Sequence, residues 1–257
     1  LGDVYKRQSF LTPFNIQILL AAISVNMVIA LAQMLIVGIG QMNLSVGAIG
    51  GLVAISFAGL LDVCQLPIPL AVLLGLLIGL AAGLFNGVII AFTGISAFII
   101  TLASLSVFKG INLGITEAQP FYGVAESVKA FGNSSLLGTF PLLILPTLVC
   151  LVGVWVLLNR MRYGRHLLAV GASPTAASLV GISVRNIVIG THALSGLLAA
   201  VAGMMVVARL QIGQPTIGDD WLILSFAAPV IGGAVLAGGH VNAVSYPHLT
   251  LPTSSLV

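Results

Sequence analysis

Long apolar runs alternate with short polar stretches along this chain. Seven runs are visible, at Ile16–Gly40, Leu44–Leu61, Leu66–Phe92, Ala97–Ile115, Leu136–Leu158, Ile187–Ala208 and Leu222–Leu236. A helix needs about 20 apolar residues to cross the hydrocarbon layer of a membrane. The pattern therefore predicts an all-α, polytopic transmembrane helical bundle. The last run is short, contains Pro229 and Gly232-Gly233, and is followed by Gly238-Gly239, which indicates a broken or re-entrant segment.

The composition supports the same assignment. Of the residues, 59% are hydrophobic and 6% are charged, whereas soluble domains carry about 25% charged residues. These few charges do not cover a water-exposed surface, so the lipid bilayer is the expected surroundings of most of the chain. The net charge of +3 is small and gives no indication of a nucleic-acid partner.

Sequence motifs for catalysis are missing. The chain contains no GxxxxGK(S/T) phosphate loop, no GxSxG and no HExxH. We therefore expect a protein that is not an enzyme, with no catalytic, cofactor-binding or metal-ligating residues. Cys64 and Cys150 lie in apolar surroundings without CxxC or Cys/His spacing. We interpret both as small buried hydrophobic residues rather than disulfide partners or metal ligands.

The charged residues are unevenly distributed. Residues Asn159–Asn186 hold four of the nine Lys and Arg residues and no acidic residue. Cytoplasmic loops of membrane proteins accumulate Lys and Arg, so this basic segment is predicted to be cytoplasmic. Counting the spans away from it puts Thr116–Ser135 and Gly213–Asp220 on the outer side, and these two loops carry four of the six acidic residues.

The two ends of the chain differ from the rest. The same count puts Lys6 and Arg7 on the outer side, against the positive-inside rule. Residues 1–8 and 244–257 resemble peptides translated from sequencing-adaptor DNA, and we expect them to be non-native tails. Residues 9–243 are then expected to form one partial membrane domain, truncated at both ends.

Small residues recur with helical spacing in two of the runs. Gly75, Gly79, Gly83 and Gly87 fall on one face of a helix, and such a stripe lets a neighbouring backbone approach closely. Gly196, Ala200 and Gly203 form a weaker version of the same pattern. The stripes predict close helix packing.

The basic segment contains a short helix with a defined start and end. Ser173 suits the N-cap, Pro174 suits the first helical position, and Gly181 can adopt the left-handed conformation that ends a helix. One interpretation is a small protrusion that contacts a soluble partner. The other is an interfacial linker whose arginines meet anionic lipid headgroups.

Four blocks of sequence resemble, in order, the permeases of bacterial ABC importers for ribose, xylose and galactosides. The blocks are NLSVG at 43–47, AFIITL at 97–102 with KG at 109–110 and QP at 119–120, RYGRHLLAVGASPTAASLVGISV at 162–184, and ARL at 208–210 with QPT at 214–216 and AAPVIGGAVLAGG at 227–239. Asn43 stands where the family usually has Asp, and Lys109 where it usually has Arg. The resemblance covers about residues 9–243.

The resemblance implies a membrane-spanning permease subunit of an ATP-driven importer, which translocates a monosaccharide or similar polyol across the bacterial inner membrane. The helix at 174–180 would be the coupling helix that docks on a cytoplasmic ATP-binding subunit. That subunit would use the ATP, so the permease itself would bind no cofactor. The other implied partners are a periplasmic sugar-binding protein and a second permease subunit, in a homodimer or heterodimer. The residues assigned to the ATPase-coupling loop are Arg162, Gly164, Arg165, Gly171, Ser173, Pro174, Ala177 and Gly181.

Polar residues inside the apolar runs are candidates for a translocation path. Amides and hydroxyls suit an uncharged polyol, because they both donate and accept hydrogen bonds. Each of them alone also fits ordinary hydrogen bonding between helices. The candidates are Asn26, Gln33, Asn43, Ser45, Asn86, Thr101, Ser104 and Asn112.

The predicted outer loops offer a second set of candidates. Contact with the binding protein is expected from Gln119, Gln214, Thr216, Asp219 and Asp220, with an ordinary solvated loop as the alternative. The alternative function is an ion-coupled secondary transporter of small polar solutes. Such a transporter usually needs ionisable residues inside the membrane, and the apolar runs contain almost none.

Overall fold

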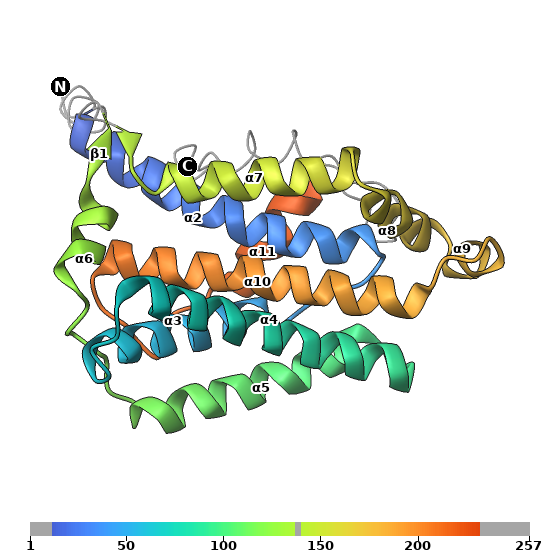
Figure 1. The fold of residues 1–257 in the computed structure, drawn as a ribbon, viewed down its shortest axis with the longest axis horizontal. Helices are drawn as coiled ribbons and strands as arrows, with labels where there is room; N and C mark the ends of the chain where they lie inside the picture. Colours follow the sequence, from blue (N-terminus) through green and yellow to red (C-terminus); the bar gives the residue numbers. More distant parts are fainter. Residues whose placement is uncertain (1–11, 137–139, 232–257) are drawn as a thin grey trace, which may run out of the picture.

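The computed structural model describes residues 12–136 and 140–231, and most of these are helical (Figure 1). The helices are α2 (Pro13–Gly38), α3 (Val46–Asp62), α4 (Ile68–Thr93), α5 (Ala97–Thr116), α6 (Glu126–Asn133), α7 (Ile144–Asn159), α8 (Arg162–Ala172), α9 (Pro174–Leu179), α10 (Val184–Leu210) and α11 (Trp221–Ile231). Among the described residues, the one sheet is the antiparallel pair of β1 (Ser135–Leu136) and β2 (Phe140–Pro141). The predicted all-α bundle is confirmed. The expected tails at 1–8 and 244–257 lie outside the described residues, as does the predicted last run beyond residue 231.

Each of the seven predicted runs contains a helix, but the helices differ in length. By length and composition α2, α4, α5 and α10 can cross a membrane, and α7 joined to α8 across a 71° bend would be a fifth span. α3 has 17 residues and begins at Val46. The chain leaves the helical conformation before it, because Gly40 has a φ of 71°.

α7 begins at Ile144, later than the predicted Leu136. Ser135 and Leu136 pair instead with Pro141 and Phe140, and the Leu142 amide donates to the Ser134 carbonyl at 2.9 Å. A proline disfavours helical conformation in the residue before it. Pro141 therefore keeps the start of this apolar run extended.

Two further expectations change with the structure. The predicted outer loop Thr116–Ser135 contains the short helix α6, which packs on α10 so closely that a Cβ at Gly132 would overlap the Ala208 carbonyl. Both cysteines are free, but Cys64 is exposed and Cys150 only partly buried. The predicted burial of the Cys64 side chain is wrong, because Cys64 lies in the turn between α3 and α4.

The centre of the bundle is formed by α2, α3 and α10. α10 runs between α2 and α4 and is largely buried, as is α2 (Figure 1). The outward faces of α4, α5 and α7 carry exposed leucine, isoleucine and phenylalanine side chains, among them Leu73, Phe85, Ile99 and Leu148. Such faces suit contact with lipid chains.

The glycine stripe of α4 packs against α10. A Cβ at Gly79 would overlap Ala200 and the Gly196 carbonyl, and a Cβ at Gly83 would overlap the His192 carbonyl. Gly196 in turn faces Gly79 and Gly83, whereas Gly203 faces Gly50 of α3. The predicted close packing is confirmed, and the weaker stripe of α10 serves two partner helices rather than one.

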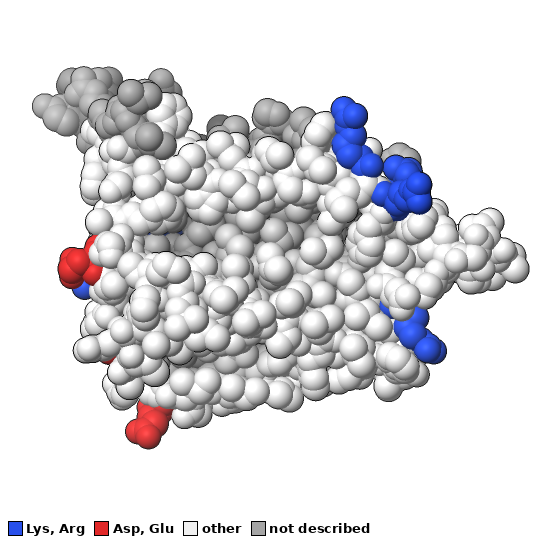
Figure 2. Space-filling view, in the orientation of Figure 1, with Lys and Arg blue, Asp and Glu red and all other residues white. Residues whose placement is uncertain are grey.

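Opposite charges gather at opposite ends of the bundle (Figure 2). We call the end with α8 and α9 the arginine end, because it carries Arg160, Arg162, Arg165 and Arg185. We call the other the acidic end, where α3 finishes at Asp62, Glu117 directly follows α5, and α6 begins at Glu126. The long helices connect the two ends.

Candidate functional site

The basic segment at the arginine end folds into two helices, α8 and α9. Ser173 caps α9, because its Oγ accepts from the Ala176 amide at 3.2 Å. Pro174 is the first helical residue, and Gly181 follows the helix with a φ of 85°. These features confirm the predicted short helix. α8 is a second helix of the basic segment, and it was not predicted.

α9 projects beyond the rest of the bundle at the arginine end (Figure 1). Its Leu179 and the following Val180 are 83% and 76% exposed. Neighbouring apolar side chains that are this exposed are typical of a surface that binds a partner. Ala177 is buried, whereas Arg162, Arg165 and Pro174 are exposed. Gly164 and Gly171 are buried, and a Cβ at Gly164 would overlap the Leu157 carbonyl.

Four of the predicted path residues meet in one buried cluster. The Asn43 Oδ1 accepts from the Ser45 amide at 2.9 Å and from the Ser45 Oγ at 2.7 Å. The Asn86 amide of α4 donates to the Ser45 Oγ at 2.8 Å. The Thr101 Oγ1 of α5 accepts from the Leu44 amide at 3.1 Å. We call these four residues, Asn43, Ser45, Asn86 and Thr101, the polar cluster.

The polar cluster exists because the chain before α3 is not helical. An Asn side chain that accepts from the amide two residues later stabilises a turn, and Asn43 does this just before α3 begins. The Asn43 Nδ2 and the Asn86 Oδ1 are buried and have no partner among the described residues. Ser104 is buried on α5 one turn beyond Thr101.

A second buried pair consists of Gln41, close to Asn43 in the sequence, and His192, and neither residue was predicted as a site residue. The Nε2 of His192 on α10 lies 2.9 Å from the Oε1 of Gln41. His192, Ser195 and Gln33 are fully buried and each has a side-chain polar atom without a partner among the described residues. Gln33 was a predicted path residue. His192 and Ser195 could have been found by the same criterion, because both are polar residues inside an apolar run.

The segment 211–220, which includes the predicted outer loop Gly213–Asp220, packs along α3. A Cβ at Gly213 would overlap Ala58, a Cβ at Gly51 would overlap the Ile217 carbonyl, and a Cβ at Gly47 would overlap the Gly218 carbonyl. The segment therefore runs from the last turns of α3 back to its first turn. Within it, the Pro215 carbonyl accepts from the Asn112 amide of α5 at 3.1 Å.

A cavity of about 240 Å³ lies between α2, α10 and this segment. Its polar side chains are Asn26, Arg209, Gln214, Thr216 and Asp220, and its apolar wall includes Val25, Trp221 and Leu224. We call it the polar cavity. It unites the predicted path residue Asn26 with three of the predicted binding-protein contacts.

The remaining outer candidates lie elsewhere. Asp219 forms an ion pair with Lys109 of α5 at 2.8 Å, and the Gln119 amide donates to the Thr116 carbonyl in the turn after α5. Arg209 was missed as a cavity residue. The signal was its position, since an arginine on the predicted outer side contradicts the positive-inside rule.

A wider cavity of about 680 Å³ opens at the arginine end. Gln41 and Met42 line it, together with Ser96, Pro174 and Arg185. The Arg185 guanidinium lies 4.5 Å from the ring centre of Phe92, a cation–π contact. Gln41 is therefore shared between this cavity and the buried His192.

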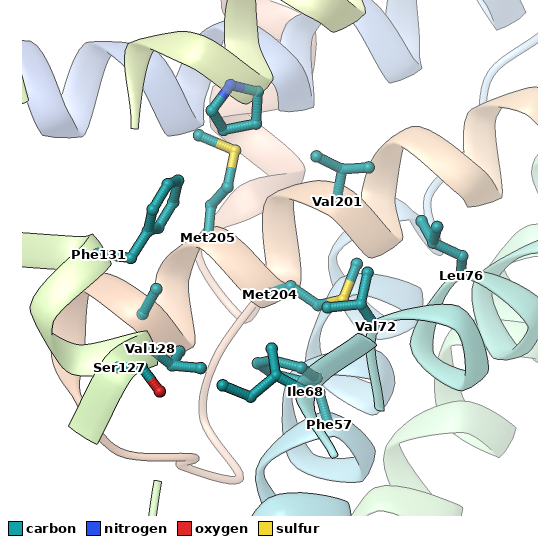
Figure 3. Close-up of a pocket in the computed structure, with 12 residues that line it drawn as sticks. Phe57, Ile68, Val72, Leu76, Ser127, Val128, Phe131, Val201, Met204 and Met205 are labelled. Atoms are coloured by element: carbon teal, nitrogen blue, oxygen red, sulfur yellow. The ribbon is translucent and has the colours of Figure 1, made fainter. Parts of the chain in front are cut away.

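A third cavity, of about 490 Å³, is almost entirely apolar (Figure 3). Met204, Met205, Phe57 and Phe131 line it, and Ser127 is its one polar side chain. Such a wall offers a polar solute no hydrogen bonds to replace those it makes with water. The polar cavity and the polar cluster are therefore better candidates for a polar solute than this apolar cavity, although the polar cavity is smaller.

Curated proteins similar to this chain include sugar permeases. A ribose import permease protein of Bacillus subtilis is 38% identical over 90% of this chain and 72% of its own length. A D-allose transport system permease protein of Escherichia coli is 33% identical over 90% of this chain and 70% of its own. A fructose import permease protein of Rhizobium meliloti is 32% identical over 90% of this chain and 66% of its own length.

No solved structure matches the chain. A protein family described as branched-chain amino acid transport system / permease component matches residues 15–246. The match includes α2 to α11, and therefore the polar cavity, the polar cluster and the basic segment. The chain belongs to this permease family and is a multi-pass protein of the inner membrane.

Proposed function

We propose that this chain is the membrane-spanning permease subunit of an ATP-driven importer for a monosaccharide or a similar uncharged polyol. The observation that carries the proposal is a line of hydrogen-bonding groups in two parts, the polar cavity and the polar cluster. Gly218 of the cavity wall packs against Gly47 at the start of α3, close in sequence to Ser45 of the polar cluster, and Gln41 precedes Asn43.

The chemistry of this line suits an uncharged solute. Hydroxyls and amides both donate and accept, so they can exchange hydrogen bonds with the hydroxyls of a sugar. The polar cluster contains no carboxylate, ammonium or guanidinium group. An ion-coupled transporter usually needs ionisable groups inside the membrane. The polar cluster has none, whereas Arg209 and Asp220 line the polar cavity and His192 contacts Gln41. The similarity to sugar import permeases favours the importer over that alternative.

Energy would enter through α9. A short capped helix with exposed Leu179 and Val180, held beyond the bundle by α8, suits docking into a groove of a soluble subunit. α9 follows α8 and precedes α10, so a displacement of α9 would reach α10 and the wall of the polar cavity. An ATP-binding subunit would bind the nucleotide, and the permease would need no cofactor.

In this proposal the arginine end is cytoplasmic and the acidic end faces the periplasm, as the positive-inside rule favours. A sugar-binding protein would deliver its ligand at the acidic end, where the polar cavity lies. A second permease subunit would complete the transporter. The sugar permeases similar to this chain support the substrate class.

The proposal is tested with the permease, its ATP-binding subunit and its binding protein reconstituted in proteoliposomes. ATP hydrolysis is expected to rise when the binding protein carries sugar and to stay low with the empty binding protein. Hydrolysis that ignores the loaded binding protein would contradict the proposal.

A further inference from the structure

We propose that the polar cavity is the site at which a neutral monosaccharide binds as it enters the permease, an inference that rests on the proposed function. The cavity is built by three separate parts of the chain: α2, the last turn of α10, and the segment 211–220 with the start of α11. Its volume is about 240 Å³.

Three of the five polar side chains of the cavity have no side-chain partner among the described residues. Among the residues the structure describes, Arg209 forms no ion pair, and no side-chain hydrogen bond is made by Asn26, Arg209 or Asp220. The one bond between cavity side chains is a long one, from Thr216 Oγ1 to Gln214 Oε1 at 3.4 Å. The half-buried guanidinium of Arg209 has five N–H donors. A ligand rich in hydroxyls would satisfy them.

The charges of the cavity balance. Arg209 and Asp220 carry one charge each of opposite sign, while the neighbouring Asp219 is engaged by Lys109 outside the cavity. A sugar hydroxyl can accept from the guanidinium and donate to the carboxylate. A ligand with a net charge would leave one of the two groups without its complement.

The walls supply the remaining features of a sugar site. Asn26 and Gln214 add amides that donate and accept, and Trp221, which is largely buried with its ring against Gly50 of α3, forms part of the apolar wall. Asn26 lies halfway along α2, so the cavity reaches from the acidic end toward the middle of the bundle. There Gly218 leads to Gly47 and the polar cluster.

Trp221 provides a direct measurement. The chain has two tryptophans, and Trp155→Phe on α7 removes the one outside the cavity. The full-chain Trp155→Phe permease is titrated in lipid nanodiscs with D-ribose, D-allose, D-fructose and L-leucine. A saturable change in Trp221 emission is expected with at least one sugar and none with L-leucine. No response to any sugar, or a response to L-leucine alone, would overturn the proposal.

Variants of the cavity test the assignment further. Asp220→Asn and Arg209→Gln are expected to raise the midpoint of the sugar titration about tenfold or more, because each removes a charged hydrogen-bond partner. Glu126→Gln is the matched control: it removes one charge at the same end, outside the cavity, and should leave the midpoint unchanged. Equal midpoints in all three variants would contradict the site. Asp220 is exposed, so Asp220→Asn leaves the fold intact.

The titration needs no ATP-binding subunit, which separates this inference from the proposed function. A sugar response without ATP-driven uptake would contradict the proposed function and leave the site standing. ATP-driven uptake with the same KM in Asp220→Asn, Arg209→Gln and the unchanged protein would contradict the site and leave the proposed function standing.

Discussion

Gly47 and Gly218 lie backbone against backbone, so that a Cβ on either would overlap the carbonyl oxygen of the other. Gly218 also has a φ of 95°, where a residue with a side chain is strained. The contact fixes the segment before α11 to the first turn of α3. It lies between the polar cavity and the polar cluster, so it determines how closely these two meet.

Replacing Gly218 by alanine is expected to destabilise the permease by about 1–3 kcal/mol, through overlap and through backbone strain. The melting temperature in detergent measures this. Gly114→Ala on α5 is the matched control, since nothing lies within 4 Å of its added Cβ, and alanine favours a helix over glycine. Equal melting temperatures for the two variants would contradict the contact.

The packing of α4 on α10 predicts a second effect. Gly83→Leu places a side chain where the His192 carbonyl and the Ala193 backbone lie. We expect loss of the folded, monodisperse protein on size-exclusion chromatography, because overpacking at a backbone contact forces the helices apart. Gly153→Leu on α7 faces open space and should elute as the unchanged protein does. Normal elution of Gly83→Leu would show that the stripe is not a packing surface.

The polar cluster predicts coupling between two residues. Ser45→Ala leaves the Asn86 amide buried without its acceptor, and Asn86→Leu removes the amide itself. Each single variant is expected to cost about 1–3 kcal/mol of stability, and the double variant less than the sum. Denaturant titration of all three variants measures the coupling. Strict additivity would mean that the bond between Ser45 and Asn86 contributes nothing.

Docking through α9 predicts that transport can be lost without loss of the fold. Leu179→Asp puts a charge on a surface that is 83% exposed, so the isolated permease should keep its melting temperature. Binding of the ATP-binding subunit and sugar uptake should both fall at least tenfold, because an apolar contact is replaced by a desolvated carboxylate. Tyr122→Asp, at a side chain 66% exposed near the acidic end, should leave subunit binding unchanged. Normal binding by Leu179→Asp would exclude α9 as the docking element.

The sequence was informative where local chemistry decides the structure. Ser173, Pro174 and Gly181 predicted the ends of α9, because caps and turns depend on neighbouring residues alone. The stripe from Gly75 to Gly87 predicted a packing face, though not that α10 would occupy it. The apolar pattern identified every long helix. It placed the start of α7 too early, since Leu136 and Phe140 are as apolar in a hairpin as in a helix.

The candidate site was predicted in parts. Asn43, Ser45, Asn86 and Thr101 were named as path residues, but their meeting depends on three elements whose packing the sequence does not show. Gln214, Thr216 and Asp220 were assigned to an outer loop. They line a cavity with Asn26 because glycines let the segment lie along α3. Arg209 and His192 were missed, since single polar residues at helix ends or interiors are common in packed bundles.

Uptake into proteoliposomes is the decisive measurement for ATP-driven import of a neutral sugar. These contain the permease and its ATP-binding subunit, with the binding protein and radiolabelled D-ribose, D-allose or D-fructose outside. Accumulation of a sugar is expected only when ATP is enclosed, and it should be unchanged when ionophores collapse the proton and sodium gradients. Accumulation without ATP that ionophores abolish would contradict ATP-driven import and identify an ion-coupled transporter.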